Sequence, residues 1–225
     1  MAVVGVIPAA GHATRLQPLD CSKEVYPVAG RPVMDYLVER MRLAPCSEIR
    51  VVTRPDKVDV IDNARRHGAT IVEGRPASLA ESILLGVRGL PDEGVVAIGF
   101  PDSIWEPVDG FASVLALLAN GWDVALGLFR GSETWRYEPV VLEAERVTRI
   151  EFKPPRSSSD WLWGCAAATA RTLLGLEGRD EPGPYFDELA QGGAVGGVRL
   201  SGSYIDIGTP SGLREAQASA RSYHS

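Results

Sequence analysis

The residues best suited to phosphate chemistry follow the first apolar run of the chain. Residues 8 to 16 read Pro-Ala-Ala-Gly-His-Ala-Thr-Arg-Leu, and a lysine follows at position 23. Small side chains let backbone N–H groups approach phosphate oxygens, and basic side chains can neutralise a triphosphate. The same pattern also suits a tight turn followed by solvated basic residues, so the loop alone does not identify a nucleotide site. The candidates are Ala9, Ala10, Gly11, His12, Ala13, Thr14, Arg15 and Lys23.

This loop differs from the two most familiar phosphate-binding patterns. No Gly-Lys-Ser/Thr follows a glycine at the spacing of a Walker loop. The third glycine and the helix start of a dinucleotide-binding turn are also missing from the sequence. A nucleotide site here must therefore be of another kind.

Three charged residues further along the chain could handle phosphates and a metal ion. Asp102 follows the apolar run from Val95 to Phe100, Lys153 precedes two prolines, and Asp206 lies in a later apolar segment. Carboxylate oxygens suit Mg²⁺, and a lysine suits a phosphate. Each residue also has an ordinary interpretation, as a turn or helix cap for the aspartates and as a solvated hairpin residue for the lysine.

Composition narrows the class of protein without identifying it. With 225 residues, 45% of them hydrophobic and 23% charged, the chain is typical of one large globular domain spanning residues 1–225. The formal net charge of -6 argues against a broad basic face for nucleic acid. The apolar run from Ala2 to Ile7 is too short for a signal peptide or membrane span, so we expect a cytoplasmic protein. Three widely spaced cysteines predict free thiols.

The candidate residues alternate with predicted strands and helices. Short apolar runs predict strands at 3–7, 49–53, 70–72, 95–100 and 124–129. Helical spacing predicts helices from Pro32 to before Pro45, at 58–67, from Ser78 onward, and at 109–118; Ser78 with Glu81 forms a capping box. After residue 129 we expect a hairpin (140–142 with 147–152), few helices, and a closing helix at 210–221.

This order predicts an α/β fold, with a mostly parallel mixed sheet between two helical layers in a Rossmann-like α/β/α arrangement. Ligands bind at the carboxyl ends of the strands in such sheets. Residues 1–129 would form the nucleotide-binding part, and residues 130–225 a small β-rich lid and acceptor-binding part with the closing helix.

Four blocks of this sequence resemble the sugar-1-phosphate nucleotidyltransferases, of which glucose-1-phosphate thymidylyltransferase is the best-known type. The first block combines Gly11-x-Ala-Thr-Arg-Leu-x-Pro with Ser-Lys-Glu and Tyr-Pro-Val-x-Gly-Arg-Pro. The others are Ile98-Gly-Phe-Pro-Asp102, Glu151-Phe-Lys-Pro with Trp163-Gly-Cys after it, and Tyr204-Ile-Asp206-Ile-Gly-Thr-Pro. The blocks occur in the family's order and cover nearly the whole chain.

The resemblance implies a fold, a reaction and a set of roles. The fold is that of the nucleotide-diphospho-sugar transferases, and the reaction joins a nucleoside triphosphate to a small phosphorylated acceptor and releases pyrophosphate. It also suggests a homodimer, while the net charge and the short first apolar run argue against a nucleic-acid or membrane partner. The implied residues are Arg15, Lys23, Asp102 and Lys153 for catalysis, Asp102 and Asp206 for Mg²⁺, Arg75 and Ser78 for the nucleotide, and Glu138, Glu151, Phe152 and Gly164 for the acceptor.

Three departures from the family pattern leave the substrates open. Arg75 stands where the family usually has a glutamine, and its N–H groups could read a carbonyl edge of thymine, uracil or cytosine. Glu138 replaces a glycine, and Phe152 replaces a glutamate that would bind sugar hydroxyls. The leading interpretation is a pyrimidine nucleotidyltransferase acting on a sugar 1-phosphate. Its alternatives are a cytidylyltransferase acting on a non-sugar phosphate or phosphonate, and a non-catalytic nucleotide- or sugar-nucleotide-binding relative.

Overall fold

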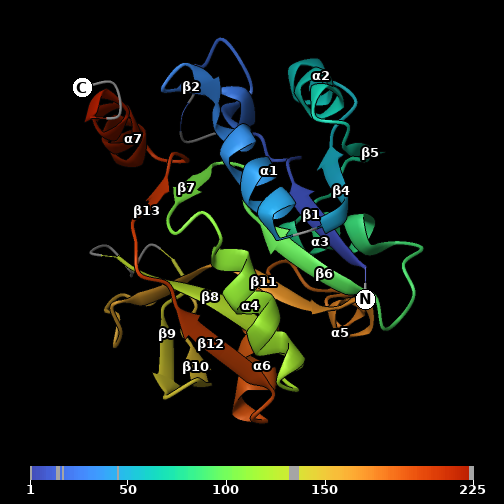
Figure 1. Ribbon diagram of the computed structural model, residues 1–225, viewed down its shortest axis with the longest axis vertical. Helices are drawn as coiled ribbons and strands as arrows, with labels where there is room; N and C mark the ends of the chain where they lie inside the picture. The colour runs from blue at the N-terminus through green and yellow to red at the C-terminus, as the bar shows by residue number, and fades with distance from the viewer. Residues whose placement is uncertain (1, 14–15, 17, 45, 132–136, 223–225) are drawn as a thin grey trace.

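A nine-stranded mixed sheet forms the centre of the protein (Figure 1). The computed structural model describes residues 2–13, 16, 18–44, 46–131 and 137–222. The strand order is β5-β4-β1-β6-β11-β8-β12-β10-β9, and β10 and β11 run opposite to the other strands. The strands are β1 (Val3–Pro8), β4 (Cys46–Thr53), β5 (Thr70–Glu73), β6 (Val95–Gly99), β8 (Val124–Arg130), β9 (Val140–Glu143), β10 (Arg146–Ile150), β11 (Trp161–Thr169) and β12 (Val195–Arg199).

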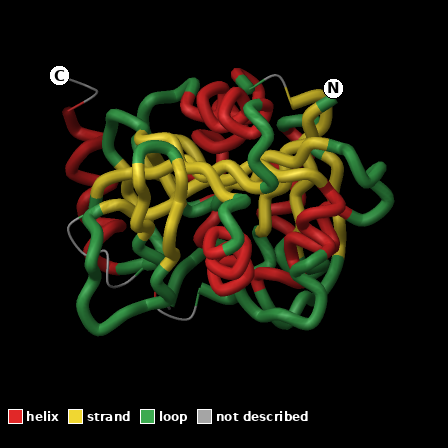
Figure 2. The backbone as a smooth tube through the Cα atoms, turned by 90° about the horizontal axis from the view of Figure 1, so that it is seen from below, coloured by secondary structure: helices red, strands yellow, loops and turns green. Residues whose placement is uncertain are grey.

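Helices cover both faces of this sheet, which Figure 2 shows nearly edge-on between two helical layers. One apolar core packs α1 (Val33–Leu43), α2 (Val58–Arg66) and α4 (Gly110–Ala119) on one face. Another packs α3 (Leu79–Val87), α5 (Ala170–Leu174) and α6 (Pro182–Gln191) on the other face. Because side chains alternate along a strand, Val4 and Val6 of β1 enter the α3 core while Ile7 enters the α1 core.

Local sequence signals set several helix boundaries. The Ser78 side chain accepts a 3.1 Å hydrogen bond from the Glu81 N–H, and the Glu81 carboxylate accepts a 2.7 Å bond from the Ala77 N–H. These bonds satisfy N–H groups that the first turn of α3 would otherwise leave unpaired. Gly68, with φ of +63°, follows α2 in the left-handed conformation that glycine adopts without strain. The predicted capping box and glycine stop are confirmed.

A smaller group of elements lies at one end of the main sheet. β7 (Ser103–Trp105) pairs antiparallel with β13 (Tyr204–Asp206), and β2 (Pro27–Val28) pairs with β3 (Arg31–Pro32). The short 3₁₀ helix η2 (Lys23–Val25) precedes β2, and α7 (Pro210–Ser222) follows β13. Val28, Ile205 and Ala216 share a small apolar core, so α7 closes over the strands that lead to the predicted site.

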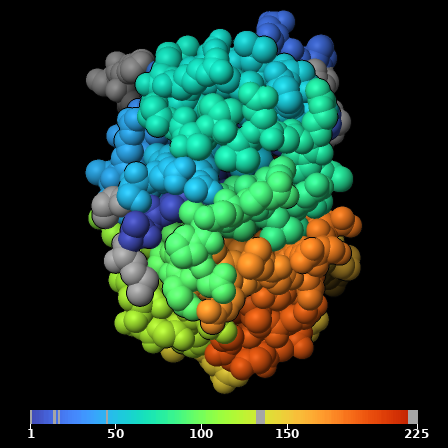
Figure 3. All heavy atoms as spheres, turned by 90° about the vertical axis from the view of Figure 1, so that its right-hand side faces the viewer, coloured from blue at the N-terminus to red at the C-terminus, as the bar shows by residue number. Residues whose placement is uncertain are grey.

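The α/β class, the five strands expected before residue 130, the hairpin of β9 and β10, and the closing helix are confirmed. The expectation of few helices between the hairpin and the closing helix was wrong, because α5 and α6 lie there. α5 is short, and α6 opens with Pro-Gly-Pro, which does not have helical spacing. In Figure 3 a green segment of the first half of the chain lies against the orange segment that contains α5, in keeping with the hydrogen bonds that the Ala170 and Arg171 N–H groups donate to the carbonyl oxygens of Gly94 and Asp92.

Among the described residues, no helix is both long enough and apolar enough to cross a bilayer.

Candidate active site

The loop after β1 is held in place by contacts with neighbouring elements. The Ala9 N–H donates a 2.8 Å hydrogen bond to the carbonyl oxygen of Val52, which extends the parallel pairing of β1 and β4 by one residue. Ala13 has φ of +51°, a left-handed conformation that costs free energy for a residue with a Cβ atom. Gly11 and His12 are exposed, so this part of the loop faces solvent at the carboxyl end of β1.

A buried ion pair between Lys57 and Glu24 holds the loop after β1 in position. The Lys57 ammonium donates to the carbonyl oxygens of Ala9 and Gly11 at 2.8 and 3.1 Å and to Glu24 Oε2 at 2.6 Å. Glu24 is fully buried, and its second carboxylate oxygen has no hydrogen-bond partner in the described part of the chain. Burial raises the pKa of Glu24, and Lys57 partly opposes that rise. Lys57 therefore joins the loop of residues 9–13, the predicted phosphate loop, to η2.

A second clamp from α2 holds the residue before Lys23. The Asp59 carboxylate accepts hydrogen bonds from the Ser22 N–H at 2.7 Å and from the Ser22 hydroxyl at 2.8 Å. The Lys23 ammonium then lies 2.5 Å from Asp102 Oδ2. Burial lowers the pKa of Lys23, but the carboxylates of Asp102, Glu24 and Asp206 together raise it by more, so the lysine stays protonated at neutral pH. Lys23 thus brings a fixed positive charge to the carboxyl end of β6.

The pairing of β7 with β13 brings the two predicted metal-binding aspartates to the same place. Asp206 is opposite Ser103 in this pair, and Ser103 directly follows Asp102. The Ile207 N–H donates a 2.9 Å hydrogen bond to the Asp102 carbonyl oxygen. The Asp206 carboxylate accepts a 2.7 Å bond from the Gly208 N–H, which fixes the side chain within its own turn.

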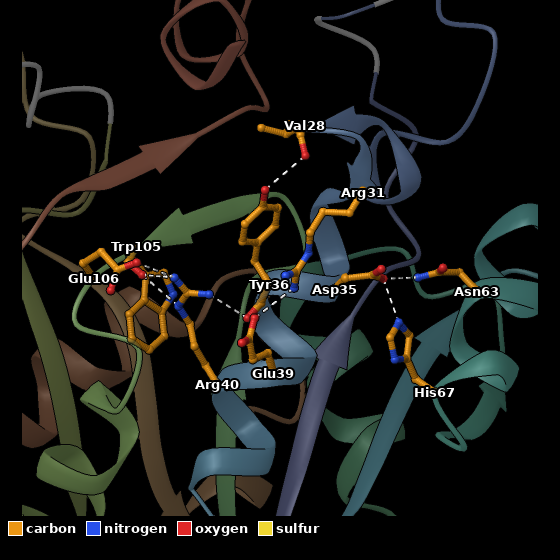
Figure 4. Close-up of polar contacts among 10 residues, drawn as sticks. All are labelled: Val28, Arg31, Asp35, Tyr36, Glu39, Arg40, Asn63, His67, Trp105 and Glu106. Carbon is orange, nitrogen blue, oxygen red and sulfur yellow. Dashed lines mark hydrogen bonds and ion pairs between the residues drawn. The ribbon is translucent and has the colours of Figure 1, made fainter. Parts of the chain in front are cut away.

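A buried arginine anchors this pair to α1. Arg40 is 2% exposed, and Figure 4 shows its guanidinium directed at Trp105 and Glu106, where it donates to the Trp105 carbonyl oxygen at the end of β7. It also donates to the Tyr36 carbonyl oxygen at 2.8 Å. Also on α1, Asp35 accepts a 2.8 Å hydrogen bond from the Asn63 side chain of α2 and lies 2.8 Å from a ring nitrogen of His67. These contacts tie α1 to the elements on both sides of it.

Two adjoining cavities meet at Asp102. The larger, of about 830 Å³, lies between the phosphate loop and the start of α3, and Lys23 and Asp102 line its inner wall. The smaller, of about 170 Å³, is lined by Lys153 and Asp206 among others. The residues that line both cavities are Leu79, Phe100, Asp102 and Glu181.

The smaller cavity combines aromatic rings with an unusual carboxyl group. Phe100 and Trp163 lie with ring centroids 5.4 Å apart, and Tyr137 and Tyr204 also line the cavity. Glu138 Oε2 accepts a 2.7 Å hydrogen bond from the Trp163 indole N–H. Burial raises the pKa of Glu138 to about 7, and that bond opposes the rise. This carboxyl group therefore changes its protonation near neutral pH.

Some of the residues that the sequence predicts for the site line the cavities, and others lie apart from them. His12, Ser78, Glu138 and Lys153 line one cavity or the other. Arg75 is exposed and forms a 2.9 Å ion pair with Asp56, while Pro76, Ala77 and Ser78 provide the adjacent wall of the larger cavity. Arg15 and Thr14 lie outside the described residues.

Three predicted acceptor residues have contacts of other kinds. The Glu151 carboxylate accepts hydrogen bonds from the Ser158 N–H and hydroxyl at 3.1 and 2.6 Å and closes a loop. Phe152 is 47% exposed, and the Lys153 ammonium lies 4.6 Å from its ring centroid. Gly164 lies in β11, where a Cβ atom would come within 2.3 Å of the Tyr204 ring. Gly164 therefore makes room for the Tyr204 ring, which lines the smaller cavity.

Sequence reasoning missed Lys57, Glu24, Trp163 and Glu181. Lys57 and Glu24 are separated by 33 positions, so no local spacing could reveal their ion pair. Trp163 carried a weak signal, since it directly precedes the glycine singled out in β11. Glu181 lies just before α6, a helix that the sequence did not predict, and its carboxylate lies 3.3 Å from the Lys153 ammonium.

The donor set around Asp102 and Asp206 fits a magnesium ion. Both carboxylates line the smaller cavity, and Mg²⁺ is typically bound by one or two carboxylates together with water and phosphate oxygens. Among the described residues, no cluster of three or more His, Cys, Asp or Glu side chains could form an all-protein metal site. A site completed by substrate phosphates is therefore the kind that these residues fit.

Comparison with known proteins identifies the family. A family model described as the MobA-like NTP transferase domain matches residues 5–151. The chain belongs to this family. Among curated relatives of this NTP transferase domain is a glucose-1-phosphate thymidylyltransferase of Neisseria meningitidis, 26% identical over 70% of this chain and 58% of the relative. Another is the bifunctional protein GlmU of Rhodopseudomonas palustris, 25% identical over 88% of this chain and 42% of the relative.

Solved structures agree with this assignment at the level of fold. A putative glucose-1-phosphate thymidylyltransferase from Bacillus anthracis superposes with a TM-score of 0.84, at 18% identity, over 98% of this chain and 96% of the other. An apo UDP-glucose pyrophosphorylase superposes with a TM-score of 0.85, also at 18% identity, over 100% of both chains. The predicted nucleotide-diphospho-sugar transferase fold and the resemblance to sugar-1-phosphate nucleotidyltransferases are confirmed. The NTP transferase domain spans 42% and 58% of the lengths of the two curated relatives above.

Proposed function

We propose that this NTP transferase domain transfers a nucleoside monophosphate from a pyrimidine nucleoside triphosphate to a sugar 1-phosphate. The products are a nucleotide sugar and pyrophosphate. The observation that carries this proposal is the position of Asp102 between a large cavity beside the phosphate loop and a small cavity that contains Lys153. A transfer enzyme needs two substrates to meet at one reacting atom, and two cavities that share a carboxylate provide that arrangement.

The reaction exchanges one bond for another at the α-phosphorus. An oxygen of the acceptor phosphate forms a bond to this phosphorus, and the bond to the oxygen that bridges the α- and β-phosphates breaks. The electron pair leaves with pyrophosphate. Because several negative charges come together, catalysis depends on cations and positioning rather than on a covalent nucleophile.

Five charged side chains of the site and its support have roles in this proposal. The phosphate loop holds the triphosphate with backbone N–H groups, and Lys23 neutralises charge on the triphosphate and on the leaving pyrophosphate. Lys153 orients the acceptor phosphate. Asp102 and Asp206 would hold Mg²⁺, which when bound supplies positive charge to the phosphates. Lys57 keeps the loop in position through its contacts with the Ala9 and Gly11 carbonyl oxygens.

The names of similar proteins bear on the identity of the base, and the lining of the smaller cavity bears on the acceptor. Names of relatives and of similar structures include a thymidylyltransferase and a UDP-glucose pyrophosphorylase, which favour a pyrimidine, although a putative mannose-1-phosphate guanyltransferase of Sulfolobus acidocaldarius is also similar. The small aromatic cavity with Glu138 favours a second candidate, a cytidylyltransferase that acts on a non-sugar phosphate or phosphonate. A non-catalytic binding relative would share the fold but release no pyrophosphate.

Pyrophosphate release with Mg²⁺ tests the proposal across a grid of the nucleoside triphosphates and phosphorylated acceptors. Release that requires one pyrimidine nucleotide and one sugar 1-phosphate is the expected result. Asp102→Asn and Asp206→Asn should lower kcat at least a hundredfold, while the matched control Asp62→Asn, at an exposed position on α2, should leave it unchanged. Nucleotide binding without release from any pair would overturn the proposal in favour of the non-catalytic relative.

A further inference from the structure

The smaller cavity contains a carboxyl group that the transfer reaction does not use. Glu138 lines this cavity together with Asp102, Asp206, Glu181 and Lys153. Asp102 and Asp206 have the metal-binding role proposed above, and the Glu181 carboxylate is paired with Lys153 at 3.3 Å. Among the described residues, no Lys or Arg side chain forms an ion pair with Glu138. Lys153, whose ammonium is paired with Glu181, offsets the charge of Glu138 only in part.

The surroundings of Glu138 hold its carboxyl group in one place. Trp163 donates its indole N–H to Oε2, and the ring of Trp163 packs against Phe100 and Phe186. On the other side, a Cβ atom at Gly183 would lie 2.2 Å from the Glu138 carboxyl group, so the carboxyl group rests on the first turn of α6. Changes at either neighbour would displace it.

A positively charged partner would stabilise the ionised form of this buried carboxyl group. Burial raises the pKa of Glu138 to about 7, so in the empty cavity a proton neutralises the group near neutral pH. An acceptor that fills the cavity removes the remaining water, which makes an unpaired carboxylate more costly still. A hydroxyl group can donate a hydrogen bond but cannot neutralise the charge. A cationic nitrogen does both, and it also gains from the aromatic faces that line the cavity.

From this arrangement we infer that the acceptor carries a protonated amino group, which Glu138 binds while Lys153 binds the acceptor phosphate. The inference rests on the proposed function and narrows its substrate class to amino-sugar 1-phosphates and other small phosphorylated amines. Four aromatic residues line the cavity with these charged groups: Phe100, Tyr137, Trp163 and Tyr204.

Acceptors that differ only in an amino or hydroxyl group provide the test. The pairs are glucosamine 1-phosphate with glucose 1-phosphate, and 2-aminoethyl phosphate with 2-hydroxyethyl phosphate, each assayed by pyrophosphate release with every nucleoside triphosphate. The aminated member of the active pair should have a kcat/KM about 10- to 100-fold higher, as expected for a hydrogen bond between charged groups. Between pH 6 and 7 this ratio should rise about fivefold as Glu138 ionises, once it is corrected for the separately measured phosphate pKa of each acceptor, which the ammonium group lowers in the aminated member.

Two variants separate the role of Glu138 from a general effect on the fold. Glu138→Gln should reduce the preference to near one, while the exposed control Glu145→Gln should leave it unchanged. Trp163→Phe keeps an aromatic ring but removes the N–H donor that opposes the rise in the pKa of Glu138. The preference for the amine should therefore appear at a higher pH in this variant, and this test does not depend on whether Glu138→Gln folds.

The outcomes distinguish this inference from the proposed function. Release with a hydroxylated acceptor and none with its aminated partner would overturn the inference and leave nucleotidyl transfer intact. A preference for the amine that survives Glu138→Gln would also overturn it. Silence with every pair would overturn the proposed function, and the inference would fall with it.

Discussion

Lys57 offers a sharp test of how the phosphate loop is held. Lys57→Met removes the cation that neutralises Glu24, which is fully buried and already has one carboxylate oxygen without a partner. Removing one member of a buried ion pair costs about 3–5 kcal/mol of unfolding free energy, because the other charge stays buried and unpaired. We expect a loss in this range at pH 8.

The loss should be smaller at acidic pH. Burial raises the pKa of Glu24, and without Lys57 the pKa rises further, so the variant takes up a proton as the pH falls. Urea unfolding of the native protein and of Lys57→Met at pH 5.5 and pH 8 measures this difference. Glu24→Gln combined with Lys57→Met should recover more than half of the loss at pH 8.

An exposed residue of α2, the helix that Lys57 directly precedes, provides the control. Arg65→Met, at a position where the arginine side chain is 66% exposed, should change the unfolding free energy by less than about 0.5 kcal/mol. The reasoning is refuted if Lys57→Met costs less than about 1 kcal/mol at pH 8, or if the cost is the same at both pH values. It is also refuted if the second substitution brings no recovery.

Three further outcomes can be measured independently. Burial raises the pKa of Glu138 from 4.5 to about 7, so protonated Glu138 adds to the unfolding free energy below pH 4.5, and this contribution is lost as the pH rises through 7. Urea titrations of Glu138→Gln should therefore show an unfolding free energy that falls by about 3 kcal/mol less over this pH range than in the native protein, and an unchanged pH profile would contradict the burial of the group. Gly164→Ala places a methyl group 2.3 Å from the Tyr204 ring and should cost about 1–3 kcal/mol, whereas a neutral result would mean that the ring moves freely. Arg40→Met removes the donors that hold β7 and should lower kcat for nucleotidyl transfer more than it raises KM for the triphosphate; a change in KM alone would argue against β7 as the support of Asp102.

The sequence predicted the elements whose signals are local. β1 and β6 are short apolar runs rich in β-branched residues, and α3 begins with a capping pair, so their side chains carry the information needed. β11 reads Trp-Leu-Trp-Gly-Cys-Ala-Ala-Ala-Thr, where small residues fit a strand buried between two helical layers but have low strand propensity. Its place in the sheet depends on pairing with β6 and β8 rather than on its own pattern.

The candidate site was predictable where residues stand next to a recognisable block, and not where distant segments meet. Lys23, Asp102 and Lys153 were singled out from such blocks, and the fold brings them to adjoining cavities. The contact of Glu138 with Trp163 arises from a loop and a strand 25 residues apart, so only the fold reveals a carboxyl group buried among rings. Arg40 likewise has the sequence pattern of an ordinary helix residue, although it is buried against β7.

Oxygen labelling tests the proposed reaction most directly. An acceptor whose phosphate carries oxygen-18 is incubated with the preferred nucleoside triphosphate and Mg²⁺, and the products are analysed by mass spectrometry. If the acceptor phosphate attacks the α-phosphorus, all of the label stays in the nucleotide product, the pyrophosphate is unlabelled, and Asp102→Asn forms neither product at a comparable rate. Label in the pyrophosphate, or release of nucleoside monophosphate without a joined product, would contradict nucleotidyl transfer at this site.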